Sequence, residues 1–190
     1  MERNLTHIAL FAALIAVLGL VPKIDLGIGV PITAQSLGIM LCGTVLGAKR
    51  GALAVLLFLA LVAMGVPLLS GGRGGIGLFA SPSVGFLVGF PVAAFVTGWV
   101  MERLRGDVAL AAFNASAIGG IIVLYAFGIP GIAFMAGKPL AEAAVGSLAF
   151  LPGDLVKAVL AALVTQMVAR ARPGSLLSRA QDAAGNVEAS

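Results

Sequence analysis

The sequence predicts an all-α membrane protein with six transmembrane helices. Of its 190 residues, 60% are hydrophobic and only 11% are charged, whereas soluble domains carry about 25% charged residues. A helix needs about 20 mostly apolar residues to cross a bilayer, and it satisfies its own backbone hydrogen bonds there. Six apolar runs meet this requirement, and the last is interrupted by two charges: 4–22, 26–48, 51–72, 74–101, 108–137 and 143–169.

These runs set the order and the bounds of the expected helices. The first run could be mistaken for a signal peptide, but it ends in GLVP without a small-x-small cleavage pattern and follows a single arginine, so we assign it as a helix. Pro152 and Gly153 mark the start of the last helix, and Arg170 and Arg172 mark its end. The six expected helices are 5–21, 34–48, 51–69, 83–104, 109–128 and 150–171.

Cationic residues divide unequally between the two sides that these helices define. With the N-terminus inside, the outer connections hold Lys23, Arg73 and Lys138, and Lys157 remains within the membrane. The distribution follows the positive-inside rule and predicts cytoplasmic termini. The net charge of +4 therefore needs no nucleic-acid partner. The cytoplasmic connections hold Arg3, Lys49, Arg50, Arg103, Arg105, Arg170, Arg172 and Arg179.

The first expected helix carries alanines at a spacing typical of helix contacts. Ala9 and Ala13 are four residues apart, as are Ala12 and Ala16. Small residues at this spacing let another helix approach closely. The alanines predict a contact either within the chain or with a partner subunit.

The outer connection between the third and fourth helices is rich in glycine. Its sequence, SGGRGGIGLFASPS, places Gly72, Gly74 and Gly75 beside Arg73. Glycine tolerates unusual backbone torsions and lets the backbone approach a ligand closely. The loop either folds over a ligand and presents Arg73, or it is a flexible connection with its arginine in water. It lacks the Gly-Lys-Ser/Thr ending of a Walker nucleotide loop.

Asp154 and Lys157 lie three residues apart in the last helix and therefore share one face. Their position near the helix start places them in the outer part of the bilayer, at the depth of the glycine loop. Charge at the bilayer centre costs about 2.5 to 3.5 kcal/mol on insertion scales. Either the two residues neutralise one another, or they form a polar ligand site, or they belong to a proton relay.

Neutral and aromatic residues offer further candidates for such a site. Thr33 and Gln35 in the first outer connection either line a pocket or begin the second helix. Aromatic residues at similar depth either contact an apolar ligand or serve helix packing: Phe79, Phe86, Phe90, Tyr125 and Phe127.

The single cysteine and the composition of the C-terminal segment complete the description of the expected domain. Cys42 is the single cysteine, so the chain offers neither an internal disulfide nor a cysteine metal cluster. After Pro173 the composition becomes small and polar. We therefore expect one transmembrane domain over 1–172 and a disordered cytoplasmic tail over 173–190.

Several segments resemble the BioY family, the biotin-binding S components of energy-coupling factor (ECF) transporters. They are GGRGGIGLFASPSVGFLVGF, LYAFGIPGIAF, FLPGDLVK and VPITAQSLGIMLCGTVLGAKRGALAV, and the similarity spans about residues 8 to 170. One departure is Ser81-Pro82-Ser83, where the family commonly has Gly-Pro-Thr. This departure weakens a side-chain assignment at Ser83.

The resemblance implies a six-helix S-component bundle in a prokaryotic cytoplasmic membrane, in contact with lipid, that captures biotin from outside. It implies partners too, a transmembrane coupling protein and two ATPases, which would use ATP while this chain needs no cofactor. For biotin, Asp154 can accept from the ureido N–H groups and Lys157 can donate to the ureido carbonyl. Arg73 or the loop backbone can hold the carboxylate, and the reverse orientation stays open. The substrate-binding candidates are Asp154, Lys157, Arg73, Gly72, Gly74, Gly75, Gln35, Phe86 and Tyr125.

Two other functional classes remain as alternatives. A self-contained proton-coupled secondary transporter of a small carboxylate or vitamin would need no ATPase. An intramembrane enzyme is disfavoured because the sequence offers no paired nucleophile and base and no metal cluster. The resemblance leads us to predict a non-enzymatic, vitamin-capturing membrane subunit, with the secondary transporter as the alternative.

Overall fold

The computed structural model describes residues 2–24 and 30–179. Within these ranges the secondary structure is helical apart from two isolated β-bridges, Ile24 with Ile32 and Leu69 with Arg73. Short 3-10 turns lie at Ile76–Ala80, Leu148–Phe150, Pro173–Ser175 and Leu177–Arg179, and a π-helical segment lies at Ile118–Val123. The α-helices are α1 (Glu2–Leu18), α2 (Gln35–Leu46), α3 (Ala48–Ala63), α4 (Val84–Arg103), α5 (Val108–Ala117), α6 (Leu124–Ala136), α7 (Leu140–Ser147) and α8 (Leu151–Ala171).

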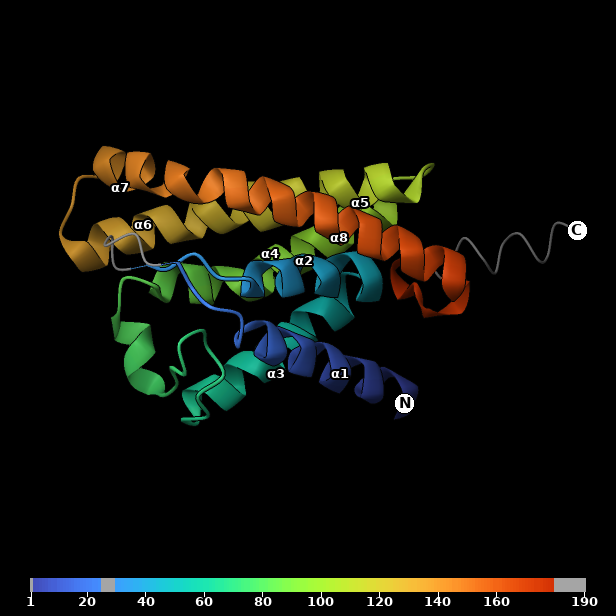
Figure 1. Cartoon of the computed structure of the whole chain (residues 1–190), viewed down its shortest axis with the longest axis horizontal. Helices are drawn as coiled ribbons and strands as arrows, with labels where there is room; N and C mark the ends of the chain where they lie inside the picture. The colour runs from blue at the N-terminus through green and yellow to red at the C-terminus, as the bar shows by residue number, and fades with distance from the viewer. Residues whose placement is uncertain (1, 25–29, 180–190) are drawn as a thin grey trace, which may run out of the picture.

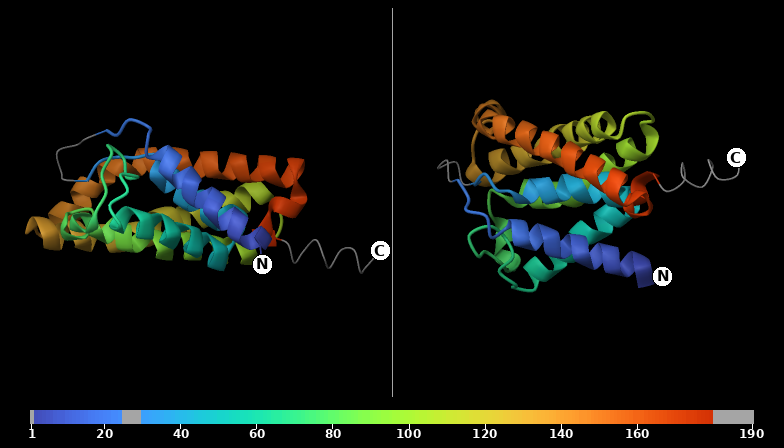
Figure 2. Two further views of the ribbon diagram at one scale, coloured as in Figure 1. Left: turned by 90° about the horizontal axis from the view of Figure 1, so that it is seen from below. Right: turned by 45° about the vertical axis from the view of Figure 1, so that its right-hand side comes forward.

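The helices form an elongated bundle in which α1 starts and α8 ends at the same end (Figures 1 and 2). The α2–α3 and α4–α5 connections also lie at this end. Among the residues that the structure describes, three helical stretches are long and apolar enough to cross a membrane: Val84–Arg103, Val108–Ala136 and Leu140–Ala171. Helices α1 and α2 are apolar but shorter.

Three of the expected helix bounds differ from the structure. The stretch expected at 109–128 continues to Ala136, because the helix passes through Pro130, which membrane helices tolerate when neighbouring groups compensate for the lost hydrogen bond. The last stretch begins at Leu140, ahead of Pro152. Helix α3 ends at Ala63 rather than at 69, because Gly65 has a φ of 102° that takes the chain out of the helix.

Helix α4 is central to the bundle and packs against α2, α3 and α6. At Gly98 the backbones come so close that an added Cβ would lie 2.2 Å from the Ala48 nitrogen and 2.3 Å from the Gly47 carbonyl carbon. Glycine is therefore required where α4 crosses the α2–α3 junction.

The alanine pairs of α1 face two directions. Ala12 is only 4% exposed and belongs to the main hydrophobic core, and Ala16 packs against that core. Ala9 and Ala13 are exposed. For Ala12 the contact is therefore within the chain, which is one of the two alternatives expected from the sequence. Ala9 and Ala13 stay available for such a contact.

The residues just after α8 pack against the bundle. Ser178 Oγ donates to the Thr44 carbonyl at 2.5 Å, and Arg179 donates to the carbonyls of Gly106 at 2.8 Å and Leu104 at 2.5 Å. Leu176 is buried. Residues 173–179, which the sequence analysis assigned to the tail, are thus held by hydrogen bonds and burial. The rest of the expected tail, 180–190, lies outside the described residues.

Candidate ligand pocket

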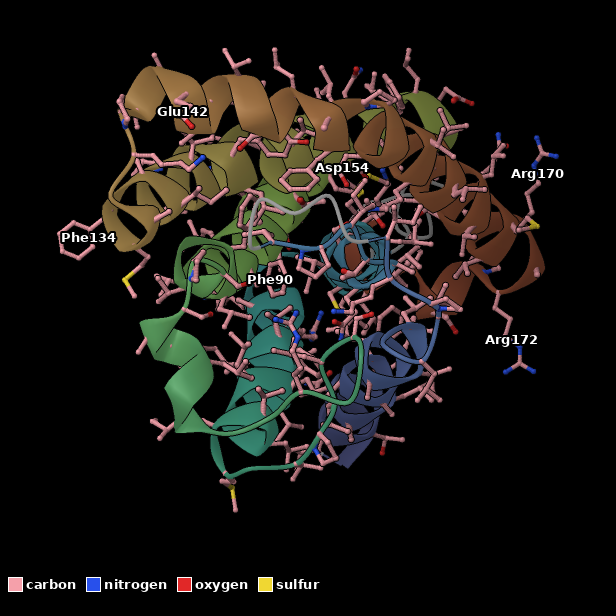
Figure 3. All side chains as sticks on the ribbon, turned by 60° about the vertical axis from the view of Figure 1, so that its left-hand side comes forward. Phe90, Phe134, Glu142, Asp154, Arg170 and Arg172 are labelled. Atoms are coloured by element: carbon pink, nitrogen blue, oxygen red, sulfur yellow. The ribbon has the colours of Figure 1, made fainter. Side chains whose placement is uncertain are left out.

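A pocket opens at the end of the bundle opposite the start of α1. The segment before α2, the glycine loop and the first turns of α4 and α8 meet there (Figure 3). The cavity volume is about 70 Å³, whereas ligand pockets usually span about 300 to 1,000 Å³. The cavity is therefore smaller than a typical ligand pocket. The lining residues are Val30, Pro31, Ile32, Thr33, Gln35, Ser36, Leu69, Arg73, Ser83, Phe86, Leu87, Phe90, Leu124, Phe150, Asp154 and Lys157.

Four side chains from three helical segments form a polar cluster on one wall. Lys157 Nζ donates to Asp154 Oδ1 at 2.8 Å and to Ser36 Oγ at 3.0 Å. Asp154 also accepts from Ser36 Oγ at 3.3 Å and, on Oδ2, from the Tyr125 hydroxyl at 2.8 Å. The polar cluster, Ser36, Tyr125, Asp154 and Lys157, thus joins α2, α6 and α8.

The polar cluster has hydrogen-bonding positions left for a ligand. The Asp154 and Lys157 side chains are 8% and 14% exposed and form an ion pair. A carboxylate offers about four acceptor positions and an ammonium offers three donors. Three acceptor positions of Asp154 and two donors of Lys157 are engaged within the cluster. One donor and one acceptor can therefore bind a polar ligand without breaking the pair.

Aromatic rings form the apolar wall beside the cluster. Phe86 contacts Tyr125 with ring centroids 6.3 Å apart and Phe150 with centroids 6.0 Å apart, both edge to face. Phe90 also lines the pocket, and Figure 3 shows it directed into the bundle. In contrast, Phe127 is exposed. The pocket therefore combines a charged wall with an apolar wall, as small-molecule sites commonly do.

The glycine loop brings Arg73 to the pocket, although its glycines do not line it. Arg73 pairs through its backbone with Leu69, and its Nε donates to the Ser70 carbonyl at 3.2 Å. Gly72 and Gly75 have φ values of 69° and 98°, which favour glycine. At Gly74 an added Cβ would lie 2.4 Å from the Val66 carbonyl oxygen. The structure thus gives these glycines a role in shaping the loop.

Gln35 lines the pocket, but its amide holds three segments together. Its Nε2 donates to the carbonyls of Ile15 at 3.2 Å and Leu68 at 3.0 Å, and its Oε1 accepts from the Ser70 N–H at 3.1 Å. The residue is 1% exposed. Its amide donors are therefore engaged in fixing the glycine loop to α1 and α2. A direct contact between Gln35 and a ligand stays a prediction.

Sequence reasoning missed two polar residues of the pocket. Ser36 follows Gln35 directly, so the polar run TAQS was the available signal. Ser83 lines the pocket and is 6% exposed, and its Oγ has no hydrogen-bond partner within the described part of the chain. The sequence analysis named Ser83 as a departure from the family pattern but did not assign it to the site. Phe150 was missed as well, since it resembles any apolar residue of its run.

Known proteins place this architecture in a family. A model of the BioY family matches residues 2–174. The chain belongs to the BioY family. It is 56% identical to the biotin transporter BioY of Rhodobacter capsulatus, over 94% of this chain and 100% of that relative. It is 58% identical to the biotin transporter BioY of Rhizobium etli, over 87% of this chain and 92% of that relative.

A solved structure supports the same placement. The fold resembles the crystal structure of an S component for biotin from an ECF-type ABC transporter, with a TM-score of 0.85 and 32% identity over 89% of this chain and 92% of that one. This likeness confirms the expected S-component-like helical fold. The BioY relatives are named as transporters, which confirms the prediction that the chain is not an enzyme.

Proposed function

We propose that this chain is the substrate-capture subunit of a biotin uptake transporter. The polar cluster beside an aromatic wall carries this proposal, because it offers charged hydrogen-bonding groups and an apolar surface in one pocket. The biotin transporters among its relatives, and its likeness to an S component for biotin, support the same substrate.

The chemistry of biotin suits the two walls. Its ureido ring carries two N–H donors and a carbonyl, which match the free acceptor position of Asp154 and the free donor of Lys157. Its bicyclic body is apolar and can pack on Phe86 and Phe90. We place the valerate carboxylate near Arg73 and Ser83, which line the pocket together. The charge of Arg73 favours a carboxylate there.

We further propose six membrane crossings with both termini in the cytoplasm of a prokaryotic cell. The three long apolar stretches support three of the crossings, and α1, α2 and α3 supply the others if the membrane is thin or locally deformed. The excess of cationic residues at the end where α1 starts supports the orientation. The pocket then opens outward, where biotin is captured.

The energy for uptake would come from partners. We propose association with a transmembrane coupling protein and two ATPases, the partners that the resemblance to the family implies. The similar solved structure, an S component from an ECF-type ABC transporter, supports such an assembly. ATP would be used by those ATPases, and this chain would need no cofactor of its own.

Equilibrium binding of labelled biotin to the purified full chain tests the function. We expect saturable binding that unlabelled biotin displaces and that thiamine and riboflavin do not. Absence of saturable binding by a folded, monodisperse sample would overturn the proposal. Equal displacement by all three vitamins would overturn the choice of biotin.

Uptake measurements separate this function from a proton-coupled transporter. In the alternative, Asp154, a carboxylate buried in the bundle, would bind and release a proton during each transport cycle. We expect uptake by the assembled transporter to stop when ATP is depleted. Uptake that ignores ATP depletion but stops when the proton gradient collapses would instead favour the alternative.

Ser83→Ala is expected to weaken biotin binding about tenfold, because the ligand would lose the Ser83 hydroxyl as a hydrogen-bond partner. The thermal unfolding midpoint of the ligand-free protein should stay unchanged, since Ser83 Oγ has no partner among the described residues. Isothermal titration with biotin measures the affinity.

Ser147→Ala is the matched control for Ser83→Ala. Ser147 is also buried, but it does not line the pocket, and its Oγ donates to the Ala143 carbonyl at 2.8 Å. Equal affinities of the two variants would remove Ser83 from the site.

Ala13→Leu is expected to reduce biotin uptake about tenfold while biotin binding by the isolated chain is kept. Ala13 is exposed on α1, so a larger side chain would obstruct a partner helix without disturbing the core. Ala12→Leu is the comparison, because Ala12 is 4% exposed and the change should damage folding and both activities. Normal uptake by the Ala13→Leu variant would contradict the proposed partner contact.

A further inference from the structure

A second cavity lies at the opposite end of the bundle from the ligand pocket. Its volume is about 740 Å³. It lies between the start of α3, the last turns of α4 and the segment after α8. The lining includes two aromatic residues, Phe95 and Trp99, and five charged ones, Lys49, Arg50, Glu102, Arg105 and Arg179.

The lining of this basic cavity carries four cationic side chains and one carboxylate. The carboxylate, Glu102, already accepts from the Ala48 N–H at 2.8 Å. Within the described residues, Lys49, Arg50 and Arg105 have no carboxylate partner. Such an excess of positive charge in a concave site attracts an anion.

The positive potential of the cavity comes from its side chains. Helix α3 starts at Ala48 after Gly47, and the Glu102 carboxylate accepts from the Ala48 N–H at this start. This carboxylate and the end of α2 at Leu46 offset the positive end of the α3 macrodipole. Arg179 donates to the carbonyls of Leu104 and Gly106, and its Nε has no partner among the described residues.

An apolar stripe on α4 leads from the cavity along the surface of the bundle. Its residues follow helical spacing and are 50%, 37%, 41% and 44% exposed: Val88, Val92, Phe95 and Trp99. The Arg103 guanidinium lies 3.8 Å above the Trp99 ring. Tryptophan and arginine commonly lie together at the level of lipid headgroups. The stripe is therefore suited to acyl chains and the cavity to headgroups.

We infer that the basic cavity binds the phosphate headgroup of an anionic phospholipid, with an acyl chain along the α4 stripe. The four cations recognise the phosphate, and the apolar stripe favours a lipid over a free phosphate ion. Basic pockets between helices on the cytoplasmic side are suited to such headgroups. This inference depends on membrane insertion and does not depend on biotin being the substrate.

Native mass spectrometry of the full chain, released from nanodiscs with mixed lipids, tests the inference. We expect retained phosphatidylglycerol in preference to phosphatidylcholine. Lys49→Gln with Arg50→Gln should reduce retention by about tenfold to thirtyfold, because each cation near the surface contributes about 1 kcal/mol to anionic-lipid binding. Glu102→Gln should increase retention by several fold, since it removes the carboxylate from the wall.

Arg170→Gln with Arg172→Gln is the matched control, because these arginines are exposed near the end of α8 and project away from the bundle (Figure 3). We expect it to change retention less than twofold. Equal losses in both double variants would overturn the inference in favour of diffuse surface charge. Unchanged retention in Lys49→Gln with Arg50→Gln would also overturn it. Displacement of the lipid by millimolar inorganic phosphate would assign the cavity to a free anion instead.

Discussion

Asp154→Asn is expected to weaken biotin binding at least about a hundredfold, the loss typical when one partner of a buried charged contact is removed. The carboxylate accepts from Lys157, Ser36 and Tyr125, and in the proposed complex it also accepts from the ureido ring. Asparagine keeps the size but offers a single neutral acceptor oxygen. Binding of labelled biotin to the purified variant measures the effect.

A second measurement separates binding from folding. Asp154→Asn leaves the Lys157 charge unpaired at 14% exposure, and breaking a buried pair costs about 3 to 5 kcal/mol. The thermal unfolding midpoint should therefore fall in this variant and also in Lys157→Met. In the double variant the unpaired charge is gone, so the midpoint should recover while biotin binding stays lost. Recovery of binding would show that the pair serves the fold and does not contact biotin.

Glu142→Gln is the matched control for the carboxylate. Glu142 forms an ion pair with Lys138 at 2.6 Å, but the two side chains are 57% and 47% exposed. Exposed pairs contribute about 0 to 1 kcal/mol. We expect unchanged biotin affinity and an unchanged unfolding midpoint. A loss as large as that of Asp154→Asn would mean that the assay reports general damage.

Gly98→Ala is expected to lower stability by about 3 kcal/mol or more, the upper range for overpacking a tight contact. The new Cβ would lie 2.2 Å from the Ala48 nitrogen, and backbone at a helix junction cannot move aside as a flexible side chain can. The unfolding midpoint of the purified variant and its elution profile measure the effect.

Gly146→Ala provides the comparison for Gly98→Ala. Gly146 also lies in a helix, but a Cβ added there would have no neighbour within 4 Å among the described residues. Alanine is a better helix former than glycine, so the midpoint should stay unchanged or rise slightly. If both variants lost stability equally, the close approach of α4 to the α2–α3 junction would not be the cause.

The part of the site that the sequence predicted best is the pair of charged residues whose relative position follows from helix geometry alone. Asp154 and Lys157 are three residues apart in a helix, so their contact followed from their spacing. The sequence also indicated Tyr125, Phe86 and Arg73 as candidates. The structure brings all five to one pocket, either in its lining or in the polar cluster.

Residues whose role depends on a contact with a distant segment were harder to assign. Gln35 was expected either to line a pocket or to begin the second helix, and it does both, while three backbone groups from distant segments engage its amide. Ser36 was not expected, although it contacts both members of the ion pair. Ala12 and Ala13 are neighbours in sequence, yet one is buried and the other is exposed. Each outcome depends on which helix lies opposite, and one sequence does not specify this.

The sequence by itself determined a helical membrane protein with an acid and a base on one face of the last helix. These follow from composition, from run length and from the helical repeat, which act over a few residues. The tertiary structure alone decided that Ser36 joins Asp154 and Lys157 across separations of 118 and 121 residues. It also decided that four cations converge on one cavity. Such contacts arise from helix packing, where close approach at positions such as Gly98 sets which side chains meet.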